Sequence, residues 1–533
     1  MCPDLMHVDH RRRSLHDRIA PVVCALVLLA ASRASGENFG AATSDSWFDP
    51  ATWVDSSGNS GVPGASDNAF IGASGFPDAG AISNATVTLS ANATVSNVTI
   101  GTYQTTTGNG TLVLAGGVLS GAGLTLDGSA GGAATLTLNG GSLDVSGELA
   151  LIGASASVTR TSGSLTASDL SLANGASLTT SAADTITAGA TLSSDSALIL
   201  GASLSLSGAL SVTDATLNLE GFSVTASGGI TLADGGVVNR GAGDAGTVSA
   251  DGFTISGVTA FTAQSGDAFT GDGSVSGGGS FTADTPLAGL SSLAVTGTGS
   301  AFAANSQLSG GAHFAVTVTN GAALTINNGL TSGTLSASAA TFELNGGTLD
   351  VATLLLGDGN GAATVIRGGG TIDAGNVTID GGTSLTSLAG DAFDSLLMTT
   401  GEVTVRQASG DSTGLWIRNA TDSALTIDAI GGLTLVFDSA AAASSLDWIL
   451  KWGGNRLTAL NALLDDGFIT VNAANYQVSY DEAQNATFIA VPEPSSSALS
   501  MIGVVASLAA WRKRRRRSVR HVATSPHSGP NLV

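Results

Sequence analysis

The chain has 533 residues, of which 43% are apolar and only 11% charged, so Ser, Thr and Gly must form most of its polar surface. Its two cysteines, Cys2 and Cys24, both lie near the N-terminus, which excludes disulfides and cysteine-based zinc sites from the rest of the chain. Residues 37–511 contain seven basic and 38 acidic residues, and their net charge of −31 excludes nucleic acid as a partner.

Residues 1–35 are predicted to be a secretory signal peptide. The basic residues Arg11, Arg12 and Arg13 precede an apolar stretch over 19–31, and small residues follow it. The apolar stretch is shorter than the roughly 20 residues of a membrane-spanning helix, which favours a signal peptide over the alternative of an N-terminal membrane anchor. This segment predicts export.

Residues 36–101 are predicted to form an N-terminal cap. Trp47 and Trp53 are followed by Val62-Pro63 and Asp67. The pattern resembles the leader of bacterial exported repeat proteins. The alternative for the two tryptophans is an aromatic, sugar-binding surface.

Residues 102–440 are predicted to be a parallel β-helix, or β-solenoid, of an all-β protein. A short alternating strand, a glycine pair and a second short strand recur, most clearly at 111–119, 135–143, 341–349 and 364–372. The spacing of 23 to 24 residues predicts coils of about 23 residues, each with three short strands and three corners. Alternation at period two places Leu, Val, Ile and Ala inside, in an interior that we expect to be too narrow for aromatic rings.

The glycine-rich copies resemble the autotransporter-associated β-strand repeat of exported solenoids. The chain shows no C-terminal series of alternating barrel strands, so we do not expect it to translocate itself. A series of antiparallel sandwiches is the alternative architecture, but it would not require a constant period.

Residues 441–490 are predicted to be a C-terminal cap. After the aromatic stretch from Asp447 to Trp452, four leucines recur at helical spacing, and Gly467 is the expected C-cap of this helix. The leucines are Leu457, Leu460, Leu463 and Leu464. Short strands over 468–471, 476–480 and 487–491 are expected to complete it.

Residues 491–517 contain three elements in a fixed order, followed by a tail over 518–533. Val491-Pro492-Glu493-Pro494 comes first, then an apolar segment over 498–511, predicted to be a transmembrane helix. The basic cluster follows, and it would stay on the cytoplasmic side; its residues are Arg512, Lys513, Arg514, Arg515, Arg516 and Arg517.

This ordered triple resembles the PEP-CTERM sorting signal of bacterial exported proteins. The resemblance implies that an exosortase, a sorting enzyme of the membrane, is a partner and processes the chain near 491–494. The alternative is a simple tail anchor.

Candidate chemical groups are sparse in the body of the chain. Asp358 begins a sequence like a calcium loop, but the residues after it do not continue the pattern. We interpret it as a turn former, and weak calcium binding by the acidic body of the chain is the alternative. His313 is expected to be an ordinary strand residue. Asn-X-Ser/Thr sequons occur at Asn84, Asn92, Asn97, Asn376, Asn419 and Asn485. We therefore predict no catalytic, cofactor-binding or metal-binding residue, and no enzyme.

Two functional hypotheses follow. The first is an exported structural or adhesive repeat protein of the cell surface or extracellular matrix, transiently anchored in the membrane through its C-terminal helix, with an extracellular polysaccharide as a candidate partner. The second is a polysaccharide lyase or hydrolase built on a β-helix. Its candidate basic residues are Arg160, Arg240, Arg367 and Arg406, which are widely separated in the sequence.

Overall fold

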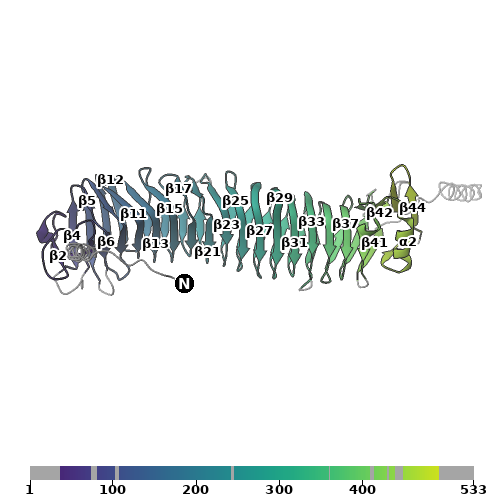
Figure 1. The fold of residues 1–533 in the computed structure, drawn as a ribbon, viewed down its shortest axis with the longest axis horizontal. Coiled ribbons are helices and arrows are strands. Elements are labelled where there is room, and N and C mark those ends of the chain that lie inside the picture. The colour runs from purple at the N-terminus through teal and green to yellow at the C-terminus, as the bar shows by residue number, and fades with distance from the viewer. Residues whose placement is uncertain are drawn as a thin grey trace, which may run out of the picture. The chain divides into compact units, whose positions relative to one another are not determined.

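The structure is a computed structural model that describes residues 36–73, 81–102, 107–241, 245–358, 361–407, 413–428, 431–437, 448–473 and 475–490. The chain divides into two compact units, one ending at Phe314 and the other beginning at Ala315. The division lies within β29 (Leu308–Thr319). Each unit is all-β apart from short helices, and each consists of strands stacked in chain order (Figure 1).

In the first unit, the strands lie on two sides of the coils. One sheet holds the strands that alternate along the chain with the others: β1 (Asn38–Ala41), β2 (Trp53–Asp55), β3 (Asn68–Ile71), β5 (Ala93–Thr94), β6 (Asn97–Gly101), β8 (Val118–Gly121), β9 (Gly123–Asp127), β11 (Ser142–Ile152), β13 (Leu165–Ala173), β15 (Thr185–Ser193), β17 (Leu204–Leu206), β18 (Leu210–Thr213), β20 (Val224–Ala226), β21 (Ile230–Ala233), β23 (Val248–Ile255), β25 (Ala268–Ser276) and β27 (Leu287–Thr296). The remaining strands form the other side of the coils: β4 (Asn84–Leu89), β7 (Asn109–Leu114), β10 (Ala134–Asn139), β12 (Ala156–Ser162), β14 (Ser177–Thr179), β16 (Ala197–Ile199), β19 (Thr216–Asn218), β22 (Val237–Asn239), β24 (Ala260–Ala263), β26 (Ser280–Ala283) and β28 (Ala301–Ala304).

The second unit repeats this plan. Its first sheet holds β31 (Leu330–Ser338), β33 (Thr348–Leu356), β35 (Thr371–Ile379), β37 (Ala392–Met398), β39 (Leu415–Ile417), β40 (Leu425–Ile427), β42 (Trp448–Gly453), β44 (Gln477–Asp481) and β45 (Ala486–Ala490). Its other side holds β30 (Ala323–Ile326), β32 (Thr341–Leu344), β34 (Thr364–Arg367), β36 (Ser384–Ser387), β38 (Glu402–Gln407), β41 (Gly432–Phe437) and β43 (Ile469–Val471). The helices of the described residues are η1 (Pro50–Thr52), η3 (Asp422–Ala424) and α2 (Leu457–Asp465).

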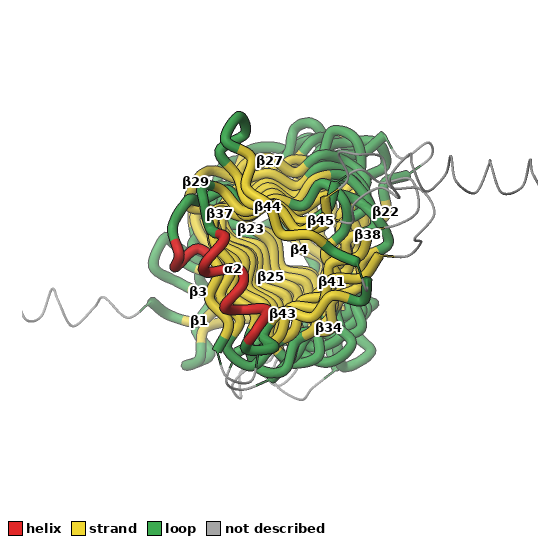
Figure 2. Tube along the Cα trace, turned by 90° about the vertical axis from the view of Figure 1, so that its right-hand side faces the viewer, coloured by secondary structure: helices red, strands yellow, loops and turns green. Residues whose placement is uncertain are grey.

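The stacking is parallel and in register, which confirms the β-solenoid prediction. Leu112 of β7 lies beside Leu136 of β10, which in turn lies beside Val158 of β12. The two leucines are buried, whereas Thr111 and Thr135, which precede them, are half-buried on the outward side, as a period of two requires. Within each unit, the strands of successive coils overlie one another when viewed along the stack (Figure 2).

Three strand segments per coil are present, but two of them often join. β11 is continuous over Ser142–Ile152, and its register with β13 shifts between Val145 and Glu148. The shift marks a bulge that bends the strand from one face of the coil to the next. The expected corner between these two segments is therefore a bend within one strand.

Coil length varies more than the sequence copies indicate. The average coil has about 22 residues. The register advances by 24 residues from Leu112 to Leu136, but by only 20 from Leu170 to Ala190 and again from Ala190 to Leu210. The expected 23-residue period therefore describes some coils, such as the one from Thr341 to Thr364, and not every coil. Because one face of each strand is buried, the strands keep their register. The turns between the strands differ in length and account for the variation in coil length.

The expectation that the interior excludes aromatic rings is wrong. Phe261, Phe281 and Phe302 occupy equivalent positions in successive coils and are buried, and the rings of Phe281 and Phe302 stack with centroids 5.1 Å apart. Two residues further along the same strands, Ala263, Ala283 and Ala304 are also buried. Because alanine side chains are small, they leave space in the interior, and the phenylalanine rings fill it.

The two ends of the described chain depart from parallel stacking. β1 pairs with β2 in an antiparallel hairpin, and the segment around Ser46 hydrogen-bonds along the outer edge of β4. At the C-terminal end, β45 pairs antiparallel with both β42 and β44. The helix α2 contacts β43 and β44, and Gly467 follows it with a φ of +77° (Figure 2). These additions satisfy strand edges that would otherwise be exposed.

Candidate functional site: the charged corners and the C-terminal exit

The tryptophans near the N-terminus lie inside the protein. Trp47 and Trp53 are both 0% exposed, and their rings pack edge to face with centroids 4.8 Å apart. The indole N–H of Trp53 donates to the backbone oxygen of Trp47 at 2.8 Å. Neither ring is accessible to a ligand, so the alternative of a sugar-binding surface at these residues is wrong.

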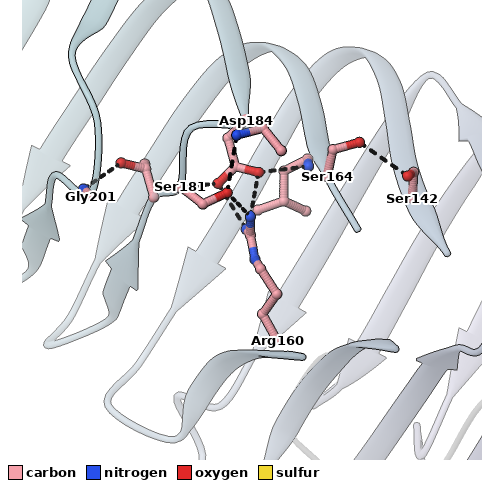
Figure 3. A network of polar contacts seen from close by, with 9 residues as sticks. Ser142, Arg160, Ser164, Ser181, Asp184 and Gly201 are labelled. Atoms are coloured by element: carbon pink, nitrogen blue, oxygen red, sulfur yellow. Dashed lines mark hydrogen bonds and ion pairs between the residues drawn. The ribbon is translucent and has the colours of Figure 1, made fainter. Parts of the chain in front are cut away.

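Three of the four arginines considered for catalysis are held in ion pairs. Arg160 pairs with Asp184 at 2.7 Å, Arg240 with Asp267 at 2.6 Å and Arg367 with Asp391 at 3.0 Å. All three aspartate side chains are at most 3% exposed. In Figure 3, Arg160 reaches out of its strand toward Asp184 in the following turn.

The three pairs share one geometry. The carboxylate of Asp267 accepts hydrogen bonds from both terminal nitrogens of Arg240. It also accepts one from the backbone N–H of Val248 and one from that of Gln264, each at 2.8 Å. Asp184 and Asp391 make the same set of contacts, each to a backbone N–H 19 residues earlier and to one three residues earlier. Each carboxylate therefore joins the start of a strand in one coil to a turn in the next.

Sequence reasoning did not find these pairs. The available signal was an arginine followed after 24 or 27 residues by a turn aspartate, which is about one coil later. The spacing becomes meaningful only when the coil length at that position is known. The arrangement neutralises each arginine, and none of the three is free to act on a substrate.

The remaining charged candidates are scattered. Arg406 is exposed on β38, and Arg418 lies between Asp373 and Asp394. Asp358 accepts the hydroxyl of Ser338 at 2.6 Å and the backbone N–H of Gly361 at 3.1 Å, as a turn former does. Within the described ranges, no three His, Cys, Asp or Glu side chains are grouped as a metal site.

His313 is exposed on β29, as a strand residue. The sequon asparagines are exposed as well, and some hydrogen-bond to the neighbouring coil: Asn109 donates to Asn84 at 2.6 Å, and Asn97 donates to Asn68 at 3.1 Å. The Asn97 pair continues a ladder from Asn38, which accepts from Asn68 at 2.8 Å.

The chain leaves the folded region at the end of β45. Ala490 lies beside Trp448 of β42 on one side and Gln477 of β44 on the other. The next residue is Val491, so the predicted sorting residues follow a strand that is paired on both sides. Val491, Pro492, Glu493 and Pro494 themselves, the signal peptide over 1–35, the tail over 518–533 and the basic cluster from Arg512 to Arg517 lie outside the described residues.

The predicted transmembrane helix over 498–511 also lies outside the described residues. Among the helices that the structure does describe, none has both the length and the apolar character needed to cross a membrane.

The comparison with protein families finds the PEP-CTERM protein-sorting motif at residues 490–516. The match spans Val491 to Pro494, the apolar segment and the basic residues up to Arg516, and it confirms the resemblance seen in the sequence. It implies an exported protein that is sorted by an exosortase. The chain matches no curated protein and no solved structure.

Proposed function

We propose that this chain is a non-enzymatic structural or adhesive protein of the bacterial cell surface or extracellular matrix, sorted through its C-terminal signal. The observation that carries the proposal is the PEP-CTERM motif at 490–516, which begins at the last residue of β45. The parallel solenoid supports it, because regular coils present long polar faces without forming an enclosed pocket by themselves.

The proposal assigns a role to each end of the chain. Residues 1–35 direct export, the segment 498–511 holds the chain in the membrane, and Arg512 to Arg517 keep the terminus on the cytoplasmic side until processing. The exosortase then acts near Pro494. Since β45 is paired on both sides, the folded cap remains intact up to Ala490 after the tail has been removed.

Mass mapping of the C-terminal peptide from separated envelope and medium fractions tests the proposal. We expect a new terminus near Pro494, and we expect Pro492→Ala to accumulate as the full-length chain. Ser518→Ala, in the tail, is the matched control and is processed normally. Recovery of intact peptides from 518–533 in the membrane fraction of the wild type would make the tail a simple anchor and reject the proposal.

The alternative, a polysaccharide-cleaving enzyme, has little support from the described residues. Arg160, Arg240 and Arg367 each have their charge satisfied by a buried aspartate. A direct assay decides: we expect the purified chain to release no new reducing ends from polygalacturonate or from a neutral glucan. Sustained release by the wild type would replace the structural proposal with an enzymatic one.

A further inference from the structure

A group of aromatic and polar side chains surrounds a lysine on the outer face of the C-terminal strands. We call this group the Lys451 cluster; it consists of Trp416, Trp448, Lys451, Gln484 and Phe488. Two of its members, Trp416 and Gln484, are exposed, two are half-buried and Phe488 is buried. Trp416 of β39, Lys451 of β42 and Phe488 of β45 are direct neighbours across three strands. The inward-facing neighbours Leu450 and Trp452 are fully buried, whereas Trp416 is 38% exposed.

The ammonium group of Lys451 is surrounded by rings. Its Nζ lies 4.6 Å from the ring centre of Trp416, 5.6 Å from that of Phe488 and 6.0 Å from that of Trp448. Its hydrogen bond is to the side-chain oxygen of Gln484 at 3.2 Å. These contacts hold the ammonium group in place, although each cation–π contact at the surface is weak.

The charge of Lys451 is unmatched among the described residues. Arg160, Arg240, Arg367, Arg418 and Arg456 each pair with one or more aspartates. Within the part of the chain that the structure describes, Lys451 contacts three aromatic rings and the neutral amide of Gln484. In a segment with a net charge of −31, a cation without a carboxylate partner is an available position for an external carboxylate.

The rings define what kind of carboxylate fits. A pyranose ring has an apolar C–H face that packs on an exposed indole, and its polar groups bond to neighbouring donors and acceptors. In the Lys451 cluster the ammonium group and the amide of Gln484 lie beside the exposed Trp416. A sugar that carries a carboxylate satisfies both features, because its carboxylate can pair with Lys451 while its ring packs on Trp416.

We propose that the Lys451 cluster binds a uronate-containing, acidic polysaccharide, with Lys451 pairing with a uronate carboxylate and Trp416 packing against the sugar ring. The inference rests on the proposed function, because an exported chain is needed to meet such a polymer. It deepens that function by naming a ligand class and a place of contact.

The test titrates the purified full-length chain with polygalacturonate oligosaccharides and follows heat release. We expect binding by the wild type and at least about tenfold weaker binding by Lys451→Gln, since a hydrogen bond to a charged group contributes about 1.5–3 kcal/mol. Trp416→Ala should weaken binding to a similar degree. Lys451→Arg keeps the positive charge and should retain most of the wild-type affinity. Arg406→Gln removes an exposed cation on β38 and is the matched control with unchanged binding.

Several outcomes overturn the inference. They are no binding by the wild type, equal binding by Lys451→Gln, or equal binding of a neutral dextran. A Lys451-dependent affinity for phosphatidylglycerol vesicles without affinity for polygalacturonate would assign the cluster to the membrane surface instead. The proposed function is tested separately by C-terminal processing: if Lys451→Gln and the wild type are both processed, a failure here concerns the ligand alone.

Discussion

At the scale of single residues, burial decides which charges matter. Asp267 is fully buried at its side chain and receives four hydrogen bonds, of which two come from Arg240. By contrast, Arg418 and its partners Asp373 and Asp394 are between 29% and 52% exposed. The Arg240–Asp267 pair joins two coils inside the protein. The contacts of Arg418 are partly exposed to water, which screens them.

Removing one member of the buried pair should destabilise the first unit strongly. Arg240→Ala leaves the carboxylate of Asp267 buried without its cation, and we expect a loss of about 3–5 kcal/mol in the free energy of unfolding. Arg418→Ala should cost about 0–1 kcal/mol. Denaturant unfolding followed by circular dichroism measures both. Equal midpoints for the two variants would contradict the assignment of Arg240 as a link between coils.

A second residue-scale prediction concerns Asp380. The hydroxyl of Thr400 donates to its carboxylate at 2.6 Å and the backbone N–H of Gly381 at 2.7 Å, and these bonds lower the pKa of Asp380 below the usual 3.8. A lowered pKa means that the stabilisation is present above the unfolded pKa and is lost as the pH falls through the folded one.

Thr400→Val removes the hydroxyl with little change of shape. We expect the pKa of Asp380 to rise toward 3.8, because the largest cause of its depression is gone. Carboxyl-labelled aspartate observed by NMR during an acid titration gives the value, and Asp380→Asn identifies the signal. An unchanged pKa in Thr400→Val would show that Gly381 and Thr399 sustain the shift without Thr400.

At the scale of the coil, the glycine pairs allow neighbouring coils to approach. Gly347 has a φ of +69°, and a Cβ there would lie 2.4 Å from the backbone of Asn328 in the previous coil. Gly382 has nearly the same conformation, with a φ of +76°, but a Cβ there would meet nothing within 4 Å. The first glycine is therefore required for both conformation and space, and the second for conformation only.

This pair makes a matched experiment. Gly382→Ala should cost about 1 kcal/mol of stability for its backbone conformation alone. Gly347→Ala should cost clearly more, because the backbone of the preceding coil must also move. Thermal unfolding of the two variants measures the difference. If the two midpoints coincide, close contact between coils does not explain the glycine at position 347.

At the scale of the whole molecule, the charge is distributed unevenly. The full chain has a formal net charge of −22, but residues 37–494 alone carry seven basic and 38 acidic residues, which is −31. The two terminal segments therefore contribute nine positive charges. A large charge of one sign favours solubility and keeps copies of the chain apart.

Processing at both ends should consequently make the protein more acidic. We expect the form recovered outside the cell to focus below the pI of about 4.3 calculated for the full chain, and to bind more strongly to an anion exchanger at pH 7. Isoelectric focusing of the envelope and medium fractions measures the shift. A secreted form with the isoelectric point of the intact chain would contradict removal of the basic ends.

The sequence by itself determined the fold class and the sorting signal, because both depend on local order. Alternation at period two requires strands with one buried face, and repetition of that pattern requires a stack of coils. The PEP-CTERM residues are contiguous, so the motif at 490–516 could be recognised without any structure. The α2 helix and its terminal Gly467 were predictable for the same reason.

Only the tertiary structure decided what depends on contacts between coils. Examples are the 20-residue coils after Leu170, the row of phenylalanines beside a row of alanines, and the three Arg–Asp links. Each depends on residues about one coil apart in the sequence. Turns of variable length hide these spacings in the sequence. Burial of Trp47 and exposure of Trp416 were equally undetermined, because a large aromatic side chain can lie on either face of a short strand, and only packing against other strands tells the two apart.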